Sequence, residues 1–371
     1  MISSALLLSI PAALAAEVTE IAPALRGDLE LRYDFAAESG TLLEADTEVG
    51  SRRIADHTLT WRGTFTYYKG LAAFFELPHT LSETVRYTDT YGMIYDPLTD
   101  SGTMLEAGRI ADPEDRKGSG LEGTWIGLRG TPFHEEVFSS RGDRSSWMVE
   151  LGYRFKDKSN FWTWGDNNKL GGGPGAPAFR MRTAWSTTYD WAEPYLVADL
   201  TRSGRITTDV VDENGVTVAR GMEVRPASTT TLRAGTELMA GSWGSQGAQA
   251  SIDLHATVTY RSWQDIPSGT YLPSTLSASE GVAATESEST TVTTGMGVNW
   301  RIMEFVQLNV GGDVGLMSPR TAEHFYNVHT NLGDLAWGVN TTLRFRARDP
   351  LFDGLKAQAA AREAASPAGM P

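Results

Sequence analysis

The fold is decided by the stretch Leu25-Arg26-Gly27-Asp28-Leu29-Glu30-Leu31-Arg32-Tyr33-Asp34-Phe35. Its odd-numbered positions are glycine or apolar, and its even-numbered positions are all charged. Successive side chains of a β-strand point to opposite faces. The stretch therefore predicts a strand with one apolar face and one fully charged face.

The same period of two recurs along the chain. Clear copies lie at 147–156, 251–261 and 334–346. Eight weaker copies lie at 52–68, 71–86, 120–130, 178–188, 194–202, 228–240, 290–300 and 304–316. Together with the first stretch they predict about 12 strands, with 10 to 14 allowed because the segments near 104–110 and 205–220 are ambiguous.

Strand length and connection length separate a membrane barrel from a soluble sandwich or an inverted, lipid-carrying barrel. Most runs have 10–14 residues, whereas soluble strands have about 5–6 and tilted membrane strands need about 9–11. Long connections are expected near 36–51, 87–119, 157–177, 203–227, 262–289 and 317–332. The connections between them are mostly short, which is typical of outer-membrane barrels. We predict an all-β protein with a single antiparallel up-and-down transmembrane β-barrel in the bacterial outer membrane.

Composition narrows the function. The chain has 371 residues, a net charge of −14 and no cysteine. The negative charge argues against nucleic acid as a partner. Without cysteine there is no disulfide, thiolate zinc site or iron–sulfur cluster, and no EF-hand spacing is present, so we expect no cofactor and no metal.

An uncharged start with an A-x-A site predicts a signal peptide at 1–16. The barrel is then expected at 17–347, followed by a short helical or disordered periplasmic tail at 348–371.

The charged face becomes the lumen of the predicted barrel. Two interpretations stay open: a salt-bridge lattice that stiffens the wall, or a polar channel that selects solutes. The residues expected to line the lumen and contact solute are Arg26, Asp28, Glu30, Arg32, Arg62, Glu76, Arg129, Glu150, Arg154, Arg180, Arg182, Arg233, Glu237, Asp253, His255 and Arg344.

The predicted external loops carry much of the negative charge. The loops at 36–50 and 262–289 contain acids and no lysine or arginine. Such loops are either simply solvated or bind divalent cations that bridge lipopolysaccharide. The expected partners are outer-membrane lipid, lipopolysaccharide and small solutes, and the oligomeric state stays open.

The sequence contains no complete catalytic motif among those considered for barrel enzymes and hydrolases. The nearest approach to a barrel hydrolase is His255-Ala256-Thr257, with threonine where those enzymes have serine. Neither G-x-S-x-G nor H-E-x-x-H occurs in the sequence. We therefore expect no enzyme, and His255 is read as a polar lumen residue.

Two short blocks carry a family resemblance. The first is 67–71 followed by Phe75-Glu76-Leu77-Pro78, and the second is 118–129. They resemble the phenol meta-pathway transporters of Gram-negative outer membranes. Glu122-Gly123 replaces that family's Gly-Asp, and its Pro-Thr-Gly after the next strand is missing. The resemblance implies a barrel that passes small, aromatic or apolar solutes.

The sequence thus predicts an outer-membrane channel or passive transporter with a lumen of mixed charge. The first alternative is a closed barrel that works through its external loops, for which the hairpin-like segment 205–220 is suited. The second is a lipid-modifying barrel enzyme that depends on His255.

Overall fold

A computed structural model describes most of the predicted barrel. The described residues are 26–44, 46–68, 70–88, 116–133, 145–155, 169–170, 176–189, 191–211, 217–243, 248–267, 283–303, 305–320 and 328–346. The predicted signal peptide at 1–16 and tail at 348–371 lie outside these ranges. The described ranges contain no helix that is long and apolar enough to cross a membrane.

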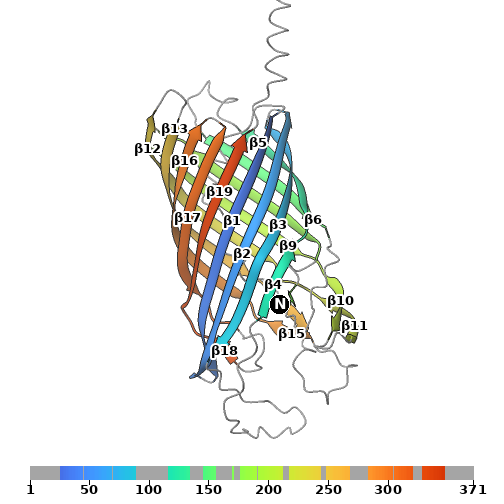
Figure 1. Cartoon of the computed structure of the whole chain (residues 1–371). Coiled ribbons are helices and arrows are strands. Elements are labelled where there is room, and N and C mark those ends of the chain that lie inside the picture. Colours follow the sequence, from blue (N-terminus) through green and yellow to red (C-terminus); the bar gives the residue numbers. More distant parts are fainter. Residues whose placement is uncertain are drawn as a thin grey trace, which may run out of the picture.

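Within the described ranges, 12 antiparallel strands close into a barrel (Figure 1). Strands that follow each other in the chain are neighbours in the wall, and β1 closes the wall by pairing with both β2 and β19. The predicted fold class and strand number are confirmed. The barrel strands are β1 (Arg26–Glu44), β2 (Thr47–Tyr68), β3 (Leu71–Thr88), β5 (Trp125–Phe133), β6 (Ser145–Arg154), β8 (Ala178–Thr187), β9 (Ala192–Ser203), β12 (Thr229–Trp243), β13 (Ala248–Arg261), β16 (Ser289–Met303), β17 (Val306–Met317) and β19 (Asp334–Arg346).

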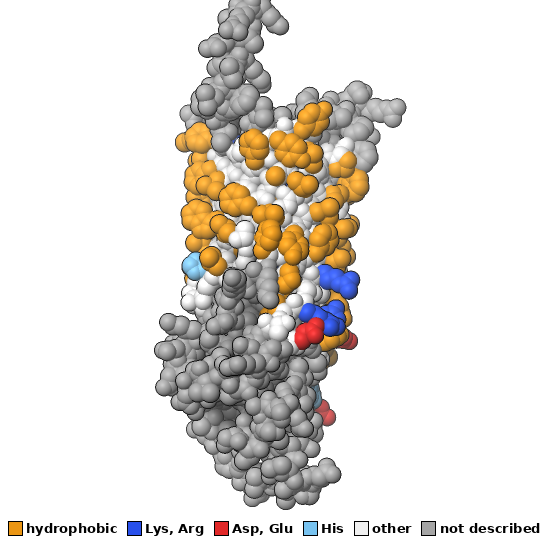
Figure 2. Space-filling model, turned by 90° about the vertical axis from the view of Figure 1, so that its right-hand side faces the viewer, with side chains coloured by type: hydrophobic (Ala, Val, Ile, Leu, Met, Phe, Trp, Pro, Cys, Tyr) orange, Lys and Arg blue, Asp and Glu red, His pale blue; other side chains and the backbone are white. Residues whose placement is uncertain are grey.

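The wall has its polar face inside and its apolar face outside. Along β13, Ser251, Asp253 and His255 are buried, while the alternating Ile252 and Leu254 are exposed. Figure 2 shows hydrophobic side chains covering the outer wall over much of its height. A soluble sandwich or lipid carrier would bury the apolar face instead, so this arrangement is that of a membrane barrel.

Many aromatic side chains lie on the outer face of the barrel. The exposed rings include Trp61, Tyr67, Trp147, Phe155, Trp185, Trp300, Trp337 and Phe345. Rings on the outer face of a membrane barrel suit the two interfaces between lipid and water, where they form girdles.

The long loop predicted near 36–51 is wrong. β1 continues to Glu44 and β2 begins at Thr47, so a tight turn joins them at Asp46, which has a φ of 67°. Glu38, expected in an acidic loop, is buried and pairs with Arg320 through a contact of 2.6 Å. The alternating pattern of the first strand ends at Phe35, yet the pairing of β1 with β2 continues to Glu44.

Shorter strands lie at the end of the barrel where the long connections are; β4, β7 and β18 belong to the barrel sheet, and the other four form two separate two-stranded sheets. β10 and β11 pair as a hairpin, which confirms the hairpin predicted at 205–220, although its turn lies outside the described residues. β14 and β15 pair in the same way. The short strands are β4 (Arg116–Leu121), β7 (Lys169–Leu170), β10 (Ile206–Val211), β11 (Thr217–Val224), β14 (Gln264–Pro267), β15 (Ala283–Glu286) and β18 (Val328–Thr330).

The chain leaves strand conformation between β4 and β5. At this point the two sequence blocks that carry the family resemblance, 67–78 and 118–129, contact each other. Pro78 has no N–H to donate, and its carbonyl accepts a hydrogen bond of 3.0 Å from Glu122 N. Gly123 adopts a φ of 93°, which favours glycine. The Glu122 side chain is 1% exposed, and it accepts a hydrogen bond of 2.6 Å from the Thr80 hydroxyl.

Candidate solute pathway in the barrel lumen

Inward-facing charges form two ladders of alternating sign along the wall. In the first, direct register partners on four neighbouring strands are Arg344, Glu30, Arg62 and Glu76. Arg344 Nη2 lies 2.9 Å from Glu30 Oε2, and Arg62 Nη1 lies 3.5 Å from Glu76 Oε2. Because opposite charges face each other across each pair of strands, the ladder stabilises the register.

The second ladder runs over the next part of the wall. Its register partners are Arg129 on β5, Glu150 on β6, Arg182 on β8 and Asp199 on β9. Arg182 Nε donates to Asp199 Oδ2 over 2.8 Å. All but Arg129 have side chains that are at most about one-tenth exposed, so the pairing compensates for their removal from bulk water.

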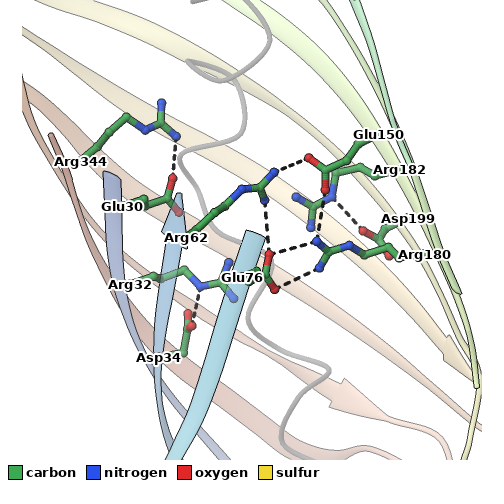
Figure 3. Close-up of polar contacts among 10 residues, drawn as sticks. All are labelled: Glu30, Arg32, Asp34, Arg62, Glu76, Glu150, Arg180, Arg182, Asp199 and Arg344. Atoms are coloured by element: carbon green, nitrogen blue, oxygen red, sulfur yellow. Dashed lines mark hydrogen bonds and ion pairs between the residues drawn. The ribbon is translucent and has the colours of Figure 1, made fainter. Parts of the chain in front are cut away.

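Arg180 and Arg62 connect the two ladders (Figure 3). Arg180 binds Glu76 with both terminal nitrogens, over 3.2 and 3.0 Å, and its Nη2 also lies 3.2 Å from Glu150 Oε1. Arg62 Nη2 donates to Glu150 Oε2. β3 and β8 are separated by two intervening strands, so these contacts reach across the curve of the wall. We name Arg62, Glu76, Glu150 and Arg180 the cross-lumen cluster.

Two aromatic rings face inward beside the cross-lumen cluster. Phe74 is 4% exposed and Trp125 is 5% exposed. The Arg180 guanidinium carbon lies 5.6 Å from the Phe74 ring centre and 4.7 Å from that of Trp125. A Cβ at Gly127 would lie 2.5 Å from the Phe74 ring. Glycine therefore leaves the space in which this ring lies against the wall.

A second polar cluster occupies the wall from β9 to β17. His255 Nδ1 lies 2.7 Å from Asp253 Oδ2, and its Nε2 lies 2.5 Å from Asp313 Oδ1. Arg233 Nη2 donates to Asp253 Oδ2 over 3.2 Å, and the Tyr195 hydroxyl donates to Asp253 Oδ1 over 2.7 Å. We name these five residues the histidine cluster. In the described part of the chain, no group of three or more acidic and histidine side chains is arranged to hold a metal ion.

Glycines make room for the histidine cluster. Gly295 on β16 is the register partner of both His255 and Asp313. A Cβ at Gly295 would overlap both His255 Nε2 and Asp313 Oδ1. Gly235 on β12 lies in the same way between Tyr195 and His255. The hydrogen bonds therefore pass over positions that have no side chain.

Near the short-turn end of the barrel, Glu237 anchors a chain of polar contacts. Its carboxylate accepts hydrogen bonds from the Ser251 hydroxyl and, over 3.0 Å, from Asn299 Nδ2. Asn309 in turn donates to Asn299. These side chains come from four strands, so this part of the lumen wall is also tied together by polar contacts.

The remaining predicted lumen residues are spread over the wall. Arg32 Nε lies 2.6 Å from Asp34 Oδ2, and Asp28 Oδ1 lies 3.3 Å from Arg346 Nε. Arg154 Nε donates to the Ala176 carbonyl over 3.1 Å. Arg26 pairs with Thr66 in the β1–β2 ladder, and its side chain lies outside the described part of the structure.

Four inward residues that complete these clusters are not among those predicted from the sequence. They are Asp199, Tyr195, Phe74 and Trp125. Asp199 and Tyr195 share the phase of the inward face on β9, so the period of two could have identified them. The two rings were missed because apolar residues were assigned to the lipid side as a class.

His255 has the surroundings of a structural polar residue. Among the described residues, its ring nitrogens contact the carboxylates of Asp253 and Asp313 and the guanidinium of Arg233. Thr257, the expected hydroxyl partner of a hydrolase, is instead the register partner of Arg233. A nucleophile next to its base is what hydroxyl-based hydrolysis needs, and the described contacts do not include that pair.

Comparisons with known proteins give structural similarity only. No family model matches the chain, and no curated protein matches it by sequence. An outer-membrane channel from Pseudomonas putida F1 shares 12% identity, with a TM-score of 0.49 over 88% of this chain and 97% of that chain. The translocator domain of the autotransporter NalP from Neisseria meningitidis shares 10% identity, with a TM-score of 0.42 over 90% and 92%. A Pseudomonas aeruginosa FadL homologue shares 10% identity, with a TM-score of 0.38 over 86% and 90%.

The architecture defines the class of protein. A closed antiparallel barrel with an apolar outer wall, exposed aromatic rings and a charged interior satisfies every backbone hydrogen bond within lipid. These features are all present in the described strands. The chain is therefore an integral β-barrel protein of the bacterial outer membrane.

Proposed function

We propose that the protein is a passive channel for small solutes whose lumen is narrowed by the cross-lumen cluster. The observation that carries this proposal is the set of contacts by which Arg180 and Arg62 reach across the wall to Glu76 and Glu150. Rings of charged side chains at a constriction set ion preference in membrane pores. Because two arginines and two glutamates alternate there, removing either sign alone unbalances the field.

The solutes that we propose are small and aromatic or apolar. Phe74 and Trp125 lie on the inner side of the wall against the Arg180 guanidinium, which gives this part of the wall an apolar component beside the charges. The resemblance of the blocks at 67–78 and 118–129 to the phenol meta-pathway transporters supports the same class. Passage would be diffusion along the polar wall, with the cross-lumen cluster setting preference.

The test is conductance of the refolded full chain in a planar bilayer under a salt gradient. Arg180→Gln removes a positive charge and Glu76→Gln a negative one, so the reversal potential should shift toward cation preference in the first variant and toward anion preference in the second. Arg205→Gln is the matched control, because Arg205 is 67% exposed and lies outside the lumen. Heat-resistant gel migration verifies folding of each variant. Insertion without conductance, or shifts of the same sign in both lumen variants, would overturn the proposal.

A second candidate function rests on the length of the strands beside the lumen. β2 has 22 residues and β1 has 19. At about 3.3 Å per residue and a tilt of about 40°, β2 rises about 55 Å, whereas the apolar band of such barrels is about 25 Å tall. The projecting part would suit contact with partners outside the cell. Wild-type protein that inserts and carries no current would favour this function over the channel.

A further inference from the structure

The outer face of β2 changes from apolar to basic at one position. The outward positions from Phe65 to Ala55 carry no lysine, arginine, aspartate or glutamate, and Arg53 is the next outward position. Arg53 is exposed. The outer surface of this strand therefore acquires a positive charge where its apolar run ends.

A second arginine lies directly opposite. Arg86 on β3 is the register partner of Arg53, and it is also exposed. Both arginines therefore present positive charge on the same side of the wall, at directly opposed positions. The neighbouring outward positions, Ser39 on β1 and Thr84 on β3, carry hydroxyl groups. Two guanidinium groups with adjacent hydroxyls suit a phosphate group, which arginine binds with two parallel hydrogen bonds.

The height of this pair matches the lipid headgroups. The Tyr33 hydroxyl lies 2.7 Å from His57 Nδ1 on the outer face, and the rings of Phe35 and Trp337 lie 4.9 Å apart beside them. Such rings mark the interface between lipid and water. Arg53 is four residues beyond His57, which places it about 10 Å further out for a strand tilted by about 40°. Figure 2 likewise shows charged side chains below the hydrophobic band on another face.

We propose that Arg53 and Arg86 bind a phosphate group of lipopolysaccharide in the outer leaflet. The site is independent of the proposed channel, because both side chains face away from the lumen. The protein as a whole carries a net charge of −14, and Asp46 in the turn and Glu48 at the start of β2 are exposed. An anionic glycolipid is therefore attracted by this local pair and not by the overall field of the protein.

The test is binding of lipid A to the refolded full chain in detergent, measured by native mass spectrometry. The probes are bisphosphorylated lipid A, the same lipid after dephosphorylation, and inorganic phosphate. We expect the wild-type protein to prefer the phosphorylated lipid by at least about tenfold, since one charge-assisted contact is worth about that factor. Arg53→Gln should reduce this preference, and R53Q/R86Q should abolish it. Arg205→Gln should leave it unchanged, because Arg205 lies in the β10–β11 region.

Several results would overturn the proposal. One is a wild-type protein that binds both lipids equally. Another is a folded R53Q/R86Q variant that keeps the preference. Equal loss in Arg205→Gln would show a general charge effect, and displacement of the lipid by millimolar inorganic phosphate would assign the site to a free anion. If R53Q/R86Q fails to fold, Arg53→Lys with Arg86→Lys keeps both charges while removing the planar donor pairs, and an unchanged preference in that variant would also refute arginine-specific binding.

Discussion

Gly295 should be a position of the barrel wall at which a single methyl group is costly. The Gly295→Ala substitution adds a Cβ that would overlap His255 Nε2 and Asp313 Oδ1 and would lie 2.7 Å from the Gly312 carbonyl. His255 and Asp313 are 2.5 Å apart across this position. The new methyl group therefore cannot fit unless their contact breaks and the backbone of β17 moves.

Three contributions determine the change in the free energy of unfolding: two lower it and one partly offsets them. Overpacking costs about 1–3 kcal/mol, and loss of a hydrogen bond to a charged group costs about 1.5–3 kcal/mol. Replacing glycine by alanine also restricts the unfolded chain, which offsets about 0.4–1 kcal/mol. We expect Gly295→Ala to lower the free energy of unfolding by about 1.5–5.5 kcal/mol.

The assay is guanidinium unfolding of the protein in phospholipid vesicles, followed by tryptophan fluorescence and by heat-resistant gel migration. Gly27→Ala is the matched control, because its new Cβ would lie 3.6 Å from the nearest atom, the Thr64 carbonyl. The effect of Gly295→Ala should shrink when Asp313 is already alanine, because the overlap with Asp313 and the contact between Asp313 and His255 are then absent. Equal stability of Gly295→Ala and Gly27→Ala would refute the described packing of His255 against Asp313.

Other substitutions test the two clusters separately. Arg180→Gln leaves Glu76 and Glu150 buried with fewer partners, so it should destabilise the barrel by about 3–5 kcal/mol in the same unfolding assay; a loss below about 1 kcal/mol would mean that water already solvates these carboxylates. Tyr195→Phe removes the hydrogen bond to Asp253 and should cost about 1.5–3 kcal/mol, and an unchanged midpoint would contradict that bond.

The fold could be predicted from the sequence because the strands of a membrane barrel alternate between apolar and polar residues, and this alternation is visible in the sequence. Each strand must be apolar toward lipid and polar toward the lumen, and 25–35 shows this alternation without exception. The turn at Asp46 was missed for a related reason. Beyond the membrane both faces meet water, so the alternation ends while strand pairing goes on.

The contacts of the lumen could not be predicted in the same way. The period of two shows that Arg180 and Glu76 face inward, yet their contact depends on which strands are neighbours and in what register. Between β3 and β8 it also depends on the curvature of the wall, which strand number and stagger determine together. A sequence of alternating charges is thus compatible with many pairings.

Inward-facing glycines determine how large side chains of neighbouring strands pack against the inner wall. Directly opposed residues on neighbouring strands are only about 5 Å apart, so a large side chain that lies along the wall must pass over its neighbour's Cβ position. A Cβ at Gly235 would lie 2.6 Å from the Tyr195 ring, and one at Gly127 would lie 2.5 Å from the Phe74 ring. Without these glycines the rings would have to project toward the barrel axis, where they would narrow the lumen. At Gly235 and Gly127, the inward glycine therefore lets a large side chain of the adjacent strand pack flat against the wall.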